Sequence, residues 1–255
     1  MTPAVPAVRL HRLEKEFVPS LTLGAILTLR RRRERVQAVR GIDLEVPPGS
    51  IHAFVGPNGA GKTTVLKLVA ALLQPTRGEV EVMGARTVAD PERVRAAVGY
   101  CITESRSFFL RISGRENLRF FATLHGLYGA VRSRRVDEVV AGLELADVAD
   151  RHVLSYSEGM KQRLALARAL IHHPRVLLLD EIGRGLDPRL REKTYRTLRD
   201  DLVGRDGVTV LMASHNMDEV AALADRVSVM EGGVVVASGT YQEVRPRVEE
   251  VFRVR

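Results

Sequence analysis

One glycine-rich segment constrains the fold of this chain more than any other. It lies between an apolar stretch, residues 50–55, and an apolar-periodic stretch, residues 65–73, which have the pattern of a buried strand and of a helix. Its glycines allow positive φ angles and let successive backbone N–H groups converge on an anion at the start of that helix. The segment therefore predicts a phosphate-binding loop, and with it a nucleotide triphosphatase. Its residues are Gly56, Pro57, Asn58, Gly59, Ala60, Gly61, Lys62, Thr63 and Thr64.

Two side chains of the loop have expected roles in the chemistry. Lys62 is placed to reach the β- and γ-phosphates and to act in catalysis, and Thr63 to bind Mg²⁺ through its hydroxyl. A glycine-rich turn that binds no nucleotide is the plainer interpretation, but the strand, the loop and the helix all occur in the expected order.

Composition narrows the kind of protein and its partners. The 255 residues are 45% apolar, enough for a substantial core, and the single cysteine, Cys101, allows no disulfide framework and suits a reducing cytosol. The chain has no apolar run of about 18 residues, so no membrane span is expected. A net charge of +8 indicates an anionic partner, such as a nucleotide, a nucleic acid or an acidic membrane surface. The absence of Trp argues against a stacking platform for single-stranded nucleic acid.

The pattern along the chain predicts an α/β fold. Short alternating segments around 42–46 and 80–82 indicate an antiparallel β layer beside the loop, and residues 114–154 read as an inserted helical lobe. Apolar segments at 176–179 and 208–212, each after a helix-length stretch, indicate parallel strands, and 226–230 with 234–237 indicate a hairpin. We expect a core of residues 8–100 and 156–240, a helical subdomain of 101–155 and a C-terminal tail of 241–255.

A second constellation is an apolar strand, Val176–Leu179, that ends in two acids. A buried strand carries its last residues to the sheet edge where open α/β proteins bind ligands, so Asp180 is expected to hold Mg²⁺ through water. Glu181, which points the other way because side chains alternate along a strand, could accept a proton from the water that attacks the γ-phosphate. If the chain had no phosphate-binding loop, the two acids could equally well cap the next helix or lie in a solvated loop.

A third constellation begins at Ser157, which can cap the helix that follows it. This places a serine hydroxyl and free backbone N–H groups at the positive end of a helix, a surface suited to a phosphate. A protein that already holds phosphate in one loop needs no second anion site, so an ordinary capped core helix remains the alternative from the residues alone.

Together these motifs resemble the nucleotide-binding subunit of an ATP-binding cassette transporter over nearly the whole chain. Gly56–Thr64 is similar to Walker A, Val176–Glu181 to Walker B and Tyr156–Met160 to the family signature. In addition, Leu186-Asp187-Pro188 resembles the D-loop, Ser214-His215 the switch histidine, and Phe17 the aromatic that stacks on adenine. The resemblance implies a P-loop NTPase core of the RecA-like type and an active, Mg²⁺-dependent ATPase.

The resemblance also implies what the second anion site does. In this family two cassettes pack head to tail, so Ser157 and Gly159 of one subunit would contact the γ-phosphate of the ATP held by the other. Glu181 and His215 would act with Lys62 in catalysis, and Asp187 would connect the two sites. The implied partners are a second nucleotide-binding subunit, with a homodimer favoured, and integral membrane permease subunits.

The same resemblance favours a peripheral protein on the cytoplasmic face of the membrane that powers export. The segments 111–118 and 156–163 resemble exporter ATPases for drugs, lipids or polysaccharides. The alternative is a soluble cassette protein that acts on ribosomes or nucleic acid, where the positive charge would bind phosphate backbone. Such proteins usually fuse two cassettes, and this chain has one, so no nucleic acid is expected.

Three departures from the family pattern bear on the site. The Q-loop glutamine is replaced by Thr103 or by Glu104, depending on the direction of counting, and either oxygen could help to hold Mg²⁺. In the signature, Glu158 adds negative charge near a phosphate site and would weaken closure unless it points outward. After Glu181, Ile182-Gly183 replaces the usual proline and threonine, which predicts a looser turn.

An insertion at residues 18–37 combines an apolar segment, 21–29, with five arginines. This composition fits a segment at a membrane surface under anionic headgroups. A solvated loop with a few buried leucines is the alternative that we favour, because surface loops tolerate insertions.

Overall fold

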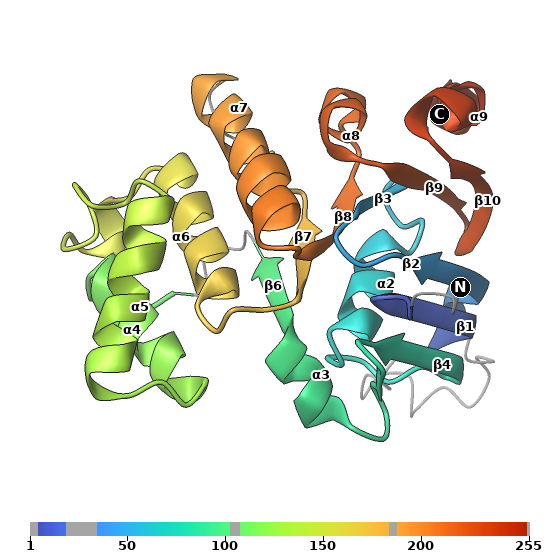
Figure 1. Cartoon of the computed structure of the whole chain (residues 1–255). Helices are drawn as coiled ribbons and strands as arrows, with labels where there is room; N and C mark the ends of the chain where they lie inside the picture. Colours follow the sequence, from blue (N-terminus) through green and yellow to red (C-terminus); the bar gives the residue numbers. More distant parts are fainter. Residues whose placement is uncertain (1–4, 19–34, 103–107, 184–187, 254–255) are drawn as a thin grey trace, which may run out of the picture.

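The computed structural model describes residues 5–18, 35–102, 108–183 and 188–253, which form two β-sheets surrounded by helices (Figure 1). The strands are β1 (Val8–Phe17), β2 (Val36–Val46), β3 (Ile51–Val55), β4 (Arg77–Val82), β5 (Ala85–Arg86), β6 (Val98–Ile102), β7 (Val176–Asp180), β8 (Thr209–Ser214), β9 (Arg226–Glu231) and β10 (Val234–Gly239). The α-helices are α2 (Lys62–Val69), α3 (Pro91–Ala97), α4 (Gly114–Leu124), α5 (Gly129–Gly142), α6 (Glu158–Leu170), α7 (Pro188–Arg196), α8 (Met217–Leu223) and α9 (Tyr241–Arg253). A 3₁₀ turn, η2 (Val153–Ser155), precedes α6, and a π-helical segment, η3 (Thr197–Arg205), continues α7.

The central sheet has the order β10-β9-β3-β8-β7-β6. Its strands β9, β3, β8, β7 and β6 are parallel, and only β10 runs antiparallel, as the partner of β9. The parallel strands and the C-terminal hairpin predicted from the sequence are thus confirmed. This order places the carboxyl ends of β3, β7 and β8 side by side, where a doubly wound α/β sheet binds its ligand.

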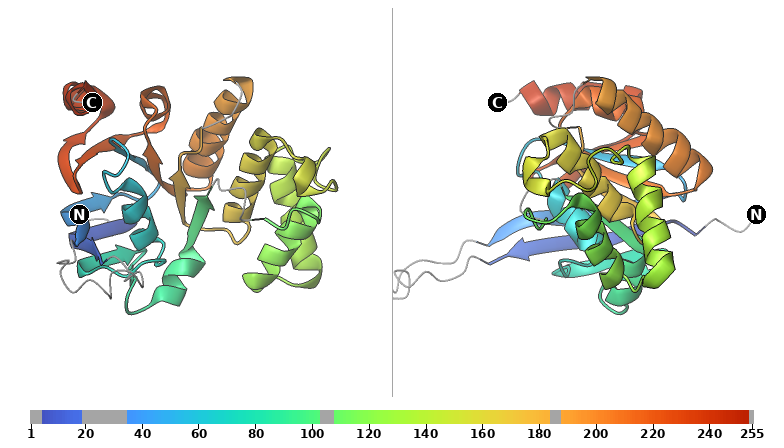
Figure 2. Two further views of the ribbon diagram at one scale, coloured as in Figure 1. Left: turned by 180° about the vertical axis from the view of Figure 1, so that it is seen from behind. Right: turned by 90° about the vertical axis from the view of Figure 1, so that its left-hand side faces the viewer.

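A smaller antiparallel sheet has the order β2-β1-β4-β5. Both β2 and β4 pair antiparallel with β1, which confirms the predicted antiparallel layer. The left view of Figure 2 shows this sheet and the helical lobe at opposite ends of the molecule, with the central sheet between them.

The hydrophobic core is divided in two by the central sheet, because successive side chains of a strand point to opposite faces. In β7, Leu177 and Leu179 join the cluster that includes the helical lobe, whereas Val176 and Leu178 join the cluster that includes the antiparallel sheet and α2. A strand buried on both faces reads as a continuous apolar run, and this explains the sequence pattern before Asp180.

The helical lobe predicted for residues 114–154 is formed by α4, α5 and η2, and α6 packs against it and against β6. Ser113 begins α4 with a capping box, in which its side chain accepts from the Glu116 amide and the Glu116 carboxylate accepts from the Ser113 amide. Strand β6 extends to Ile102, so residues 101 and 102 belong to the central sheet and not to the lobe.

Two segments near helix ends differ from the sequence expectation. The helix after the phosphate loop ends at Val69, and Leu72 is 54% exposed, so the expected apolar face does not continue through 73. The segment 241–253, expected as a tail, forms α9, which buries Val244, Val248 and Val251 against β9 and β10. Burial of that stripe, spaced at three and four residues, accounts for the helix.

Candidate active site

The phosphate loop follows β3 and leads into α2, as its sequence predicts. Gly56, Gly59 and Gly61 all have positive φ angles, of 153°, 82° and 102°. A Cβ atom at Gly56 would lie 2.1 Å from the Met230 carbonyl oxygen, and one at Gly61 would lie 2.3 Å from that of Ala38. At these two positions a side chain is excluded both by backbone angle and by close approach, so the loop geometry requires glycine.

Lys62 begins α2 and is only 6% exposed. Its Nζ atom donates hydrogen bonds to the Gly56 and Pro57 carbonyl oxygens, at 2.7 and 3.0 Å, and so lies along the inside of the loop. Burial lowers the pKa of Lys62, while the charges of Glu181 and Asp180 partly oppose this shift. An ammonium group held on carbonyl oxygens at this position can transfer its hydrogen bonds to a phosphate with little movement.

Thr63 and Asp180 meet at the edge of the sheet. The Thr63 hydroxyl donates to Asp180 Oδ1 at 3.1 Å, and the Tyr100 hydroxyl donates to Asp180 Oδ2 at 3.3 Å. Burial raises the pKa of Asp180, and the hydrogen bonds from Thr63 and Tyr100 offset part of that rise. Two hard oxygen ligands beside the lysine of a phosphate loop fit Mg²⁺, which takes few protein ligands and completes its shell with phosphate and water.

Glu181 follows β7 in a left-handed backbone conformation, with a φ of 57°. Its amide donates to the Ala213 carbonyl at 3.0 Å, which continues the pairing of β7 with β8, and its Oε1 atom lies 3.0 Å from His215 Nδ1. A non-glycine residue in this region is strained and persists only where its surroundings hold it. The carboxylate and the imidazole therefore lie together next to the phosphate loop, where a general base and a γ-phosphate contact are needed.

Ser157 caps α6, as predicted, and its hydroxyl accepts from the Met160 amide at 3.3 Å. Glu158 points outward: its side chain is 70% exposed and its Oε1 atom lies 2.9 Å from Lys161 Nζ. This ion pair removes the main objection to a phosphate near the start of α6. Helix α6 lies on the far side of β6 and β7 from α2, so this helix start and the loop are on separate parts of the chain's surface (Figure 1).

The remaining predicted site residues divide into two groups. Phe17, expected to stack on adenine, is 39% exposed at the end of β1, with Lys15 Nζ 5.3 Å from its ring centroid. Thr103, Glu104 and Asp187 lie outside the described residues, as does most of the insertion 18–37.

Sequence reasoning missed Tyr100 and Glu219. Tyr100 binds the Asp180 carboxylate from the neighbouring strand, and Glu219 is buried beside the loops that carry Glu181 and His215. The contact of Tyr100 with Asp180 depends on the sheet order, which places β6 beside β7, and the sequence does not show that order. For Glu219 the sequence signal is a carboxylate at an apolar-face position of α8.

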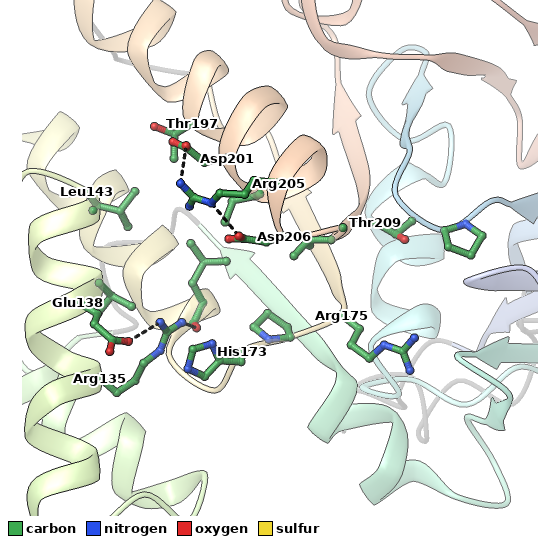
Figure 3. A pocket seen from close by; sticks show the side chains of 18 of the residues that line it. Arg135, Glu138, Leu143, His173, Arg175, Thr197, Asp201, Arg205, Asp206 and Thr209 are labelled. Atoms are coloured by element: carbon green, nitrogen blue, oxygen red, sulfur yellow. Dashed lines mark hydrogen bonds and ion pairs between the residues drawn. The ribbon is translucent and has the colours of Figure 1, made fainter.

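A cavity of about 590 Å³ lies apart from these residues, between α5, the end of α6 and η3 (Figure 3). Several of its charged side chains are paired with one another: Arg135 with Glu138, and Arg205 with Asp201 and Asp206. The cavity contains none of the residues assigned to phosphate or Mg²⁺, so we place the chemistry at the ends of β3, β7 and β8.

A phosphate loop after β3, an acid pair at the end of β7 and a histidine after β8 that contacts the second acid define this protein as a P-loop ATPase. The sequence profile of the ABC transporter family matches residues 39–183, and the chain belongs to that family. It is therefore an ATP-hydrolysing, ABC-type ATPase.

Similar proteins agree with this assignment. The chain is 42% identical to the daunorubicin resistance ATP-binding protein DrrA3 of Streptomyces coeruleorubidus, over 85% of this chain and 69% of that protein. It is 35% identical to the ABC transporter ATP-binding protein NatA of Bacillus subtilis, over 84% and 86%. The fold matches that of the ATP-binding cassette MJ0796, with a TM-score of 0.78 at 24% identity, over 91% of this chain and 98% of that one. Among the described residues, no helix is long and apolar enough to cross a bilayer.

Proposed function

We propose that this ATPase acts as a head-to-tail dimer that powers export through separate membrane-spanning subunits. One observation supports the dimer above all. A single chain carries a complete phosphate loop and, on the far side of β6 and β7, a capped helix start suited to a second phosphate contact (Figure 1). Ser157 and Gly159 are then available to an ATP held by another copy and not to the chain's own. Solved structures of MJ0796 are described as dimeric, which is consistent with this arrangement.

In this proposal each residue of the site has one task. Lys62 binds the β- and γ-phosphates, and Thr63 and Asp180 hold Mg²⁺, which neutralises charge on the phosphate oxygens. Glu181 accepts a proton from the attacking water while the oxygen of that water bonds to the γ-phosphorus. The bond to the β–γ bridging oxygen breaks, and its electron pair leaves with ADP. His215, whose Nδ1 atom lies 3.0 Å from Glu181 Oε1, contacts the γ-phosphate, and Phe17 supplies the adenine stack.

Dimerisation is driven by the nucleotide in this scheme, because ATP binds the closed pair better than the open one. Hydrolysis removes the γ-phosphate that joins the subunits, and the dimer opens. Asp187 is proposed to connect the two sites, and Thr103 or Glu104 to assist Mg²⁺.

Export is supported by the relatives. Several are named for resistance to daunorubicin, among them DrrA3 at 42% identity and DrrA of Streptomyces peucetius at 37%. The human relative ABCA7, of which this chain covers 11%, is named as a phospholipid-transporting ATPase. We propose that the chain binds peripherally to the cytoplasmic face of the membrane beneath its permease.

The test of the dimer uses Glu181→Gln. Base catalysis is typically worth about 10² to 10⁴ in rate, so steady hydrolysis should fall by that factor while ATP stays bound. Size-exclusion chromatography with light scattering should then show an ATP-dependent dimer, and a Lys62→Ala, Glu181→Gln double variant should remain monomeric. A Glu181→Gln protein that stays monomeric with saturating ATP and Mg²⁺, at high concentration and with its membrane subunits, contradicts the dimer.

The test of the membrane partner uses the same variant, tagged and purified from gently solubilised membranes with ATP. We expect a polytopic protein to copurify in stoichiometric amount. Sedimentation with ribosomes, and no polytopic partner, would instead favour the soluble alternative.

A further inference from the structure

A buried carboxylate lies behind the exposed catalytic pair. Glu219, in the first turn of α8, is 1% exposed. Its Oε2 atom accepts a hydrogen bond from the Ser214 hydroxyl at 2.5 Å. Ser214 ends β8 and directly precedes His215, and its hydroxyl also accepts from the Asn216 amide at 3.0 Å. Through Ser214, Glu219 therefore stabilises the backbone turn that carries His215.

The second oxygen of the same carboxylate faces the other catalytic loop. A Cβ atom built on Gly183 would lie 2.9 Å from Glu219 Oε1 and 3.2 Å from the Tyr195 hydroxyl. Gly183 follows Glu181 by two residues, and Ile182 between them is 2% exposed, so this turn is packed and not loose. The carboxylate occupies the space that a threonine side chain at position 183 would need.

Glu219 is shielded from water, so the polar contacts of its carboxylate are not replaced by contacts with solvent. Burial raises the pKa of Glu219, and the neighbouring Ser214 and Tyr195 hydroxyls and the Gly183 amide offset part of the rise. Within the part of the chain that the structure describes, neither Oε1 nor the Tyr195 hydroxyl completes a hydrogen bond of ordinary geometry.

The catalytic pair itself is too exposed to fix its own geometry. The side chains of His215 and Glu181 are 52% and 28% exposed, and an ion pair in such a setting contributes about 0 to 1 kcal/mol. Glu181 also has a strained, left-handed backbone, which needs support from its surroundings. The buried contacts of Glu219 reach both loops and can supply that support.

We propose that Glu219 is a positioning residue for ATP hydrolysis: its carboxylate bonds Ser214 in the turn before His215 and packs against the turn after Glu181, where glycine at 183 leaves room for it. This inference rests on the roles proposed for Glu181 and His215.

The first experiment compares Glu219→Ala and Glu219→Gln in steady ATP hydrolysis by the full chain. Loss of a residue that orients a catalytic group typically costs about 10- to 100-fold in activity. We expect kcat of Glu219→Ala to fall by that factor while KM for ATP changes less than about twofold, and Glu219→Gln, which keeps the shape and an acceptor, to recover most of kcat. The matched control is Asp218→Ala, an exposed acid in the same turn, which should match the wild type.

The second experiment separates positioning from general destabilisation. If Glu219 acts through the catalytic pair, Glu219→Ala should cost little further activity in a Glu181→Gln background, because residues that act as a unit are not additive. A loss of the same factor in both backgrounds would indicate a structural role and overturn the proposal.

The third experiment uses the space around Gly183. The φ angle of Gly183 is not in the left-handed region, so Gly183→Ala adds a methyl group without backbone strain. It should lower kcat in the wild type, where it meets the carboxylate, and cost less in the Glu219→Ala background. This variant keeps Glu219 and so tests the proposal even if Glu219→Ala folds poorly.

The outcomes distinguish this inference from the proposed function. Full activity of Glu181→Gln would remove the assigned base and the inference with it. An inactive Glu181→Gln with wild-type kcat in both Glu219→Ala and Gly183→Ala would leave the proposed function intact and overturn the positioning role alone.

Discussion

A negative charge at position 157 should leave the stability of the chain unchanged or raise it, while it lowers the activity of the dimer. Ser157 is exposed at the start of α6, and its hydroxyl accepts from the Met160 amide at 3.3 Å. Aspartate caps a helix about as well as serine, and a carboxylate near a helix N-terminus adds about 0.3–1 kcal/mol. The free energy of unfolding of Ser157→Asp should therefore be unchanged, or higher by up to about 1 kcal/mol.

Activity should move in the opposite direction if this helix start meets the γ-phosphate of a partner's ATP. Two unit charges about 4 Å apart repel by about 4 kcal/mol at an effective dielectric constant of about 20. Since about 1.4 kcal/mol is a factor of ten, each such contact should weaken by about 10³-fold, and the ATP-driven dimer, which contains two of them, should weaken by at least that factor. Isolated chains should still bind ATP, because the phosphate loop lies on the far side of β6 and β7.

The assay measures three quantities on Ser157→Asp and on Ser157→Asn, which keeps a capping oxygen without the charge. They are the urea midpoint, the affinity of the monomer for ATP, and the dimer fraction in a Glu181→Gln background. We expect Ser157→Asn to weaken ATP-dependent dimerisation by no more than about tenfold, so that its dimer fraction lies between those of the wild type and Ser157→Asp. An intact ATP-dependent dimer of Ser157→Asp would refute the contact across the interface, and a lowered urea midpoint would refute the capping argument.

Two further predictions concern Lys62 and a buried histidine. Lys62→Ala removes the cation that binds the phosphates, so the stabilisation by ATP, about 2.7 kcal/mol at 100 times Kd for the wild type, should disappear from thermal unfolding; a retained shift would contradict the assignment. Burial lowers the pKa of His52 to about 4, and its ring contacts the Ser228 hydroxyl at 2.9 Å. Between pH 6.5 and 4 the unfolded chain binds an extra proton at His52, so this residue alone should lower the free energy of unfolding by about 1.4 kcal/mol per pH unit as pH falls. His52→Gln should flatten that slope in urea titrations at several pH values, and an unchanged slope would contradict the burial argument.

Local chemistry made much of the site predictable. The glycines of the phosphate loop, the apolar run before Asp180 and the cap at Ser157 each reflect a constraint within a few residues of the chain. Backbone angles, strand burial and helix capping depend on near neighbours, so a single sequence reveals them. The parallel strands, the hairpin and the antiparallel layer followed from patterns of the same short range.

Contacts between distant segments were beyond such reasoning. Tyr100 and Asp180 are 80 residues apart and meet only because β6 and β7 are adjacent in the sheet.

The sequence alone determined that this chain has the phosphate-binding loop of an ATPase and which residues form that loop, because the loop consists of consecutive residues. The tertiary structure alone decided how the catalytic residues are held. Glu219 reads as one more acid in a helix, and its burial against Ser214 and Gly183 depends on how α8 packs on two loops from different strands. A carboxylate acquires such a role only when packing removes it from water and leaves it few partners.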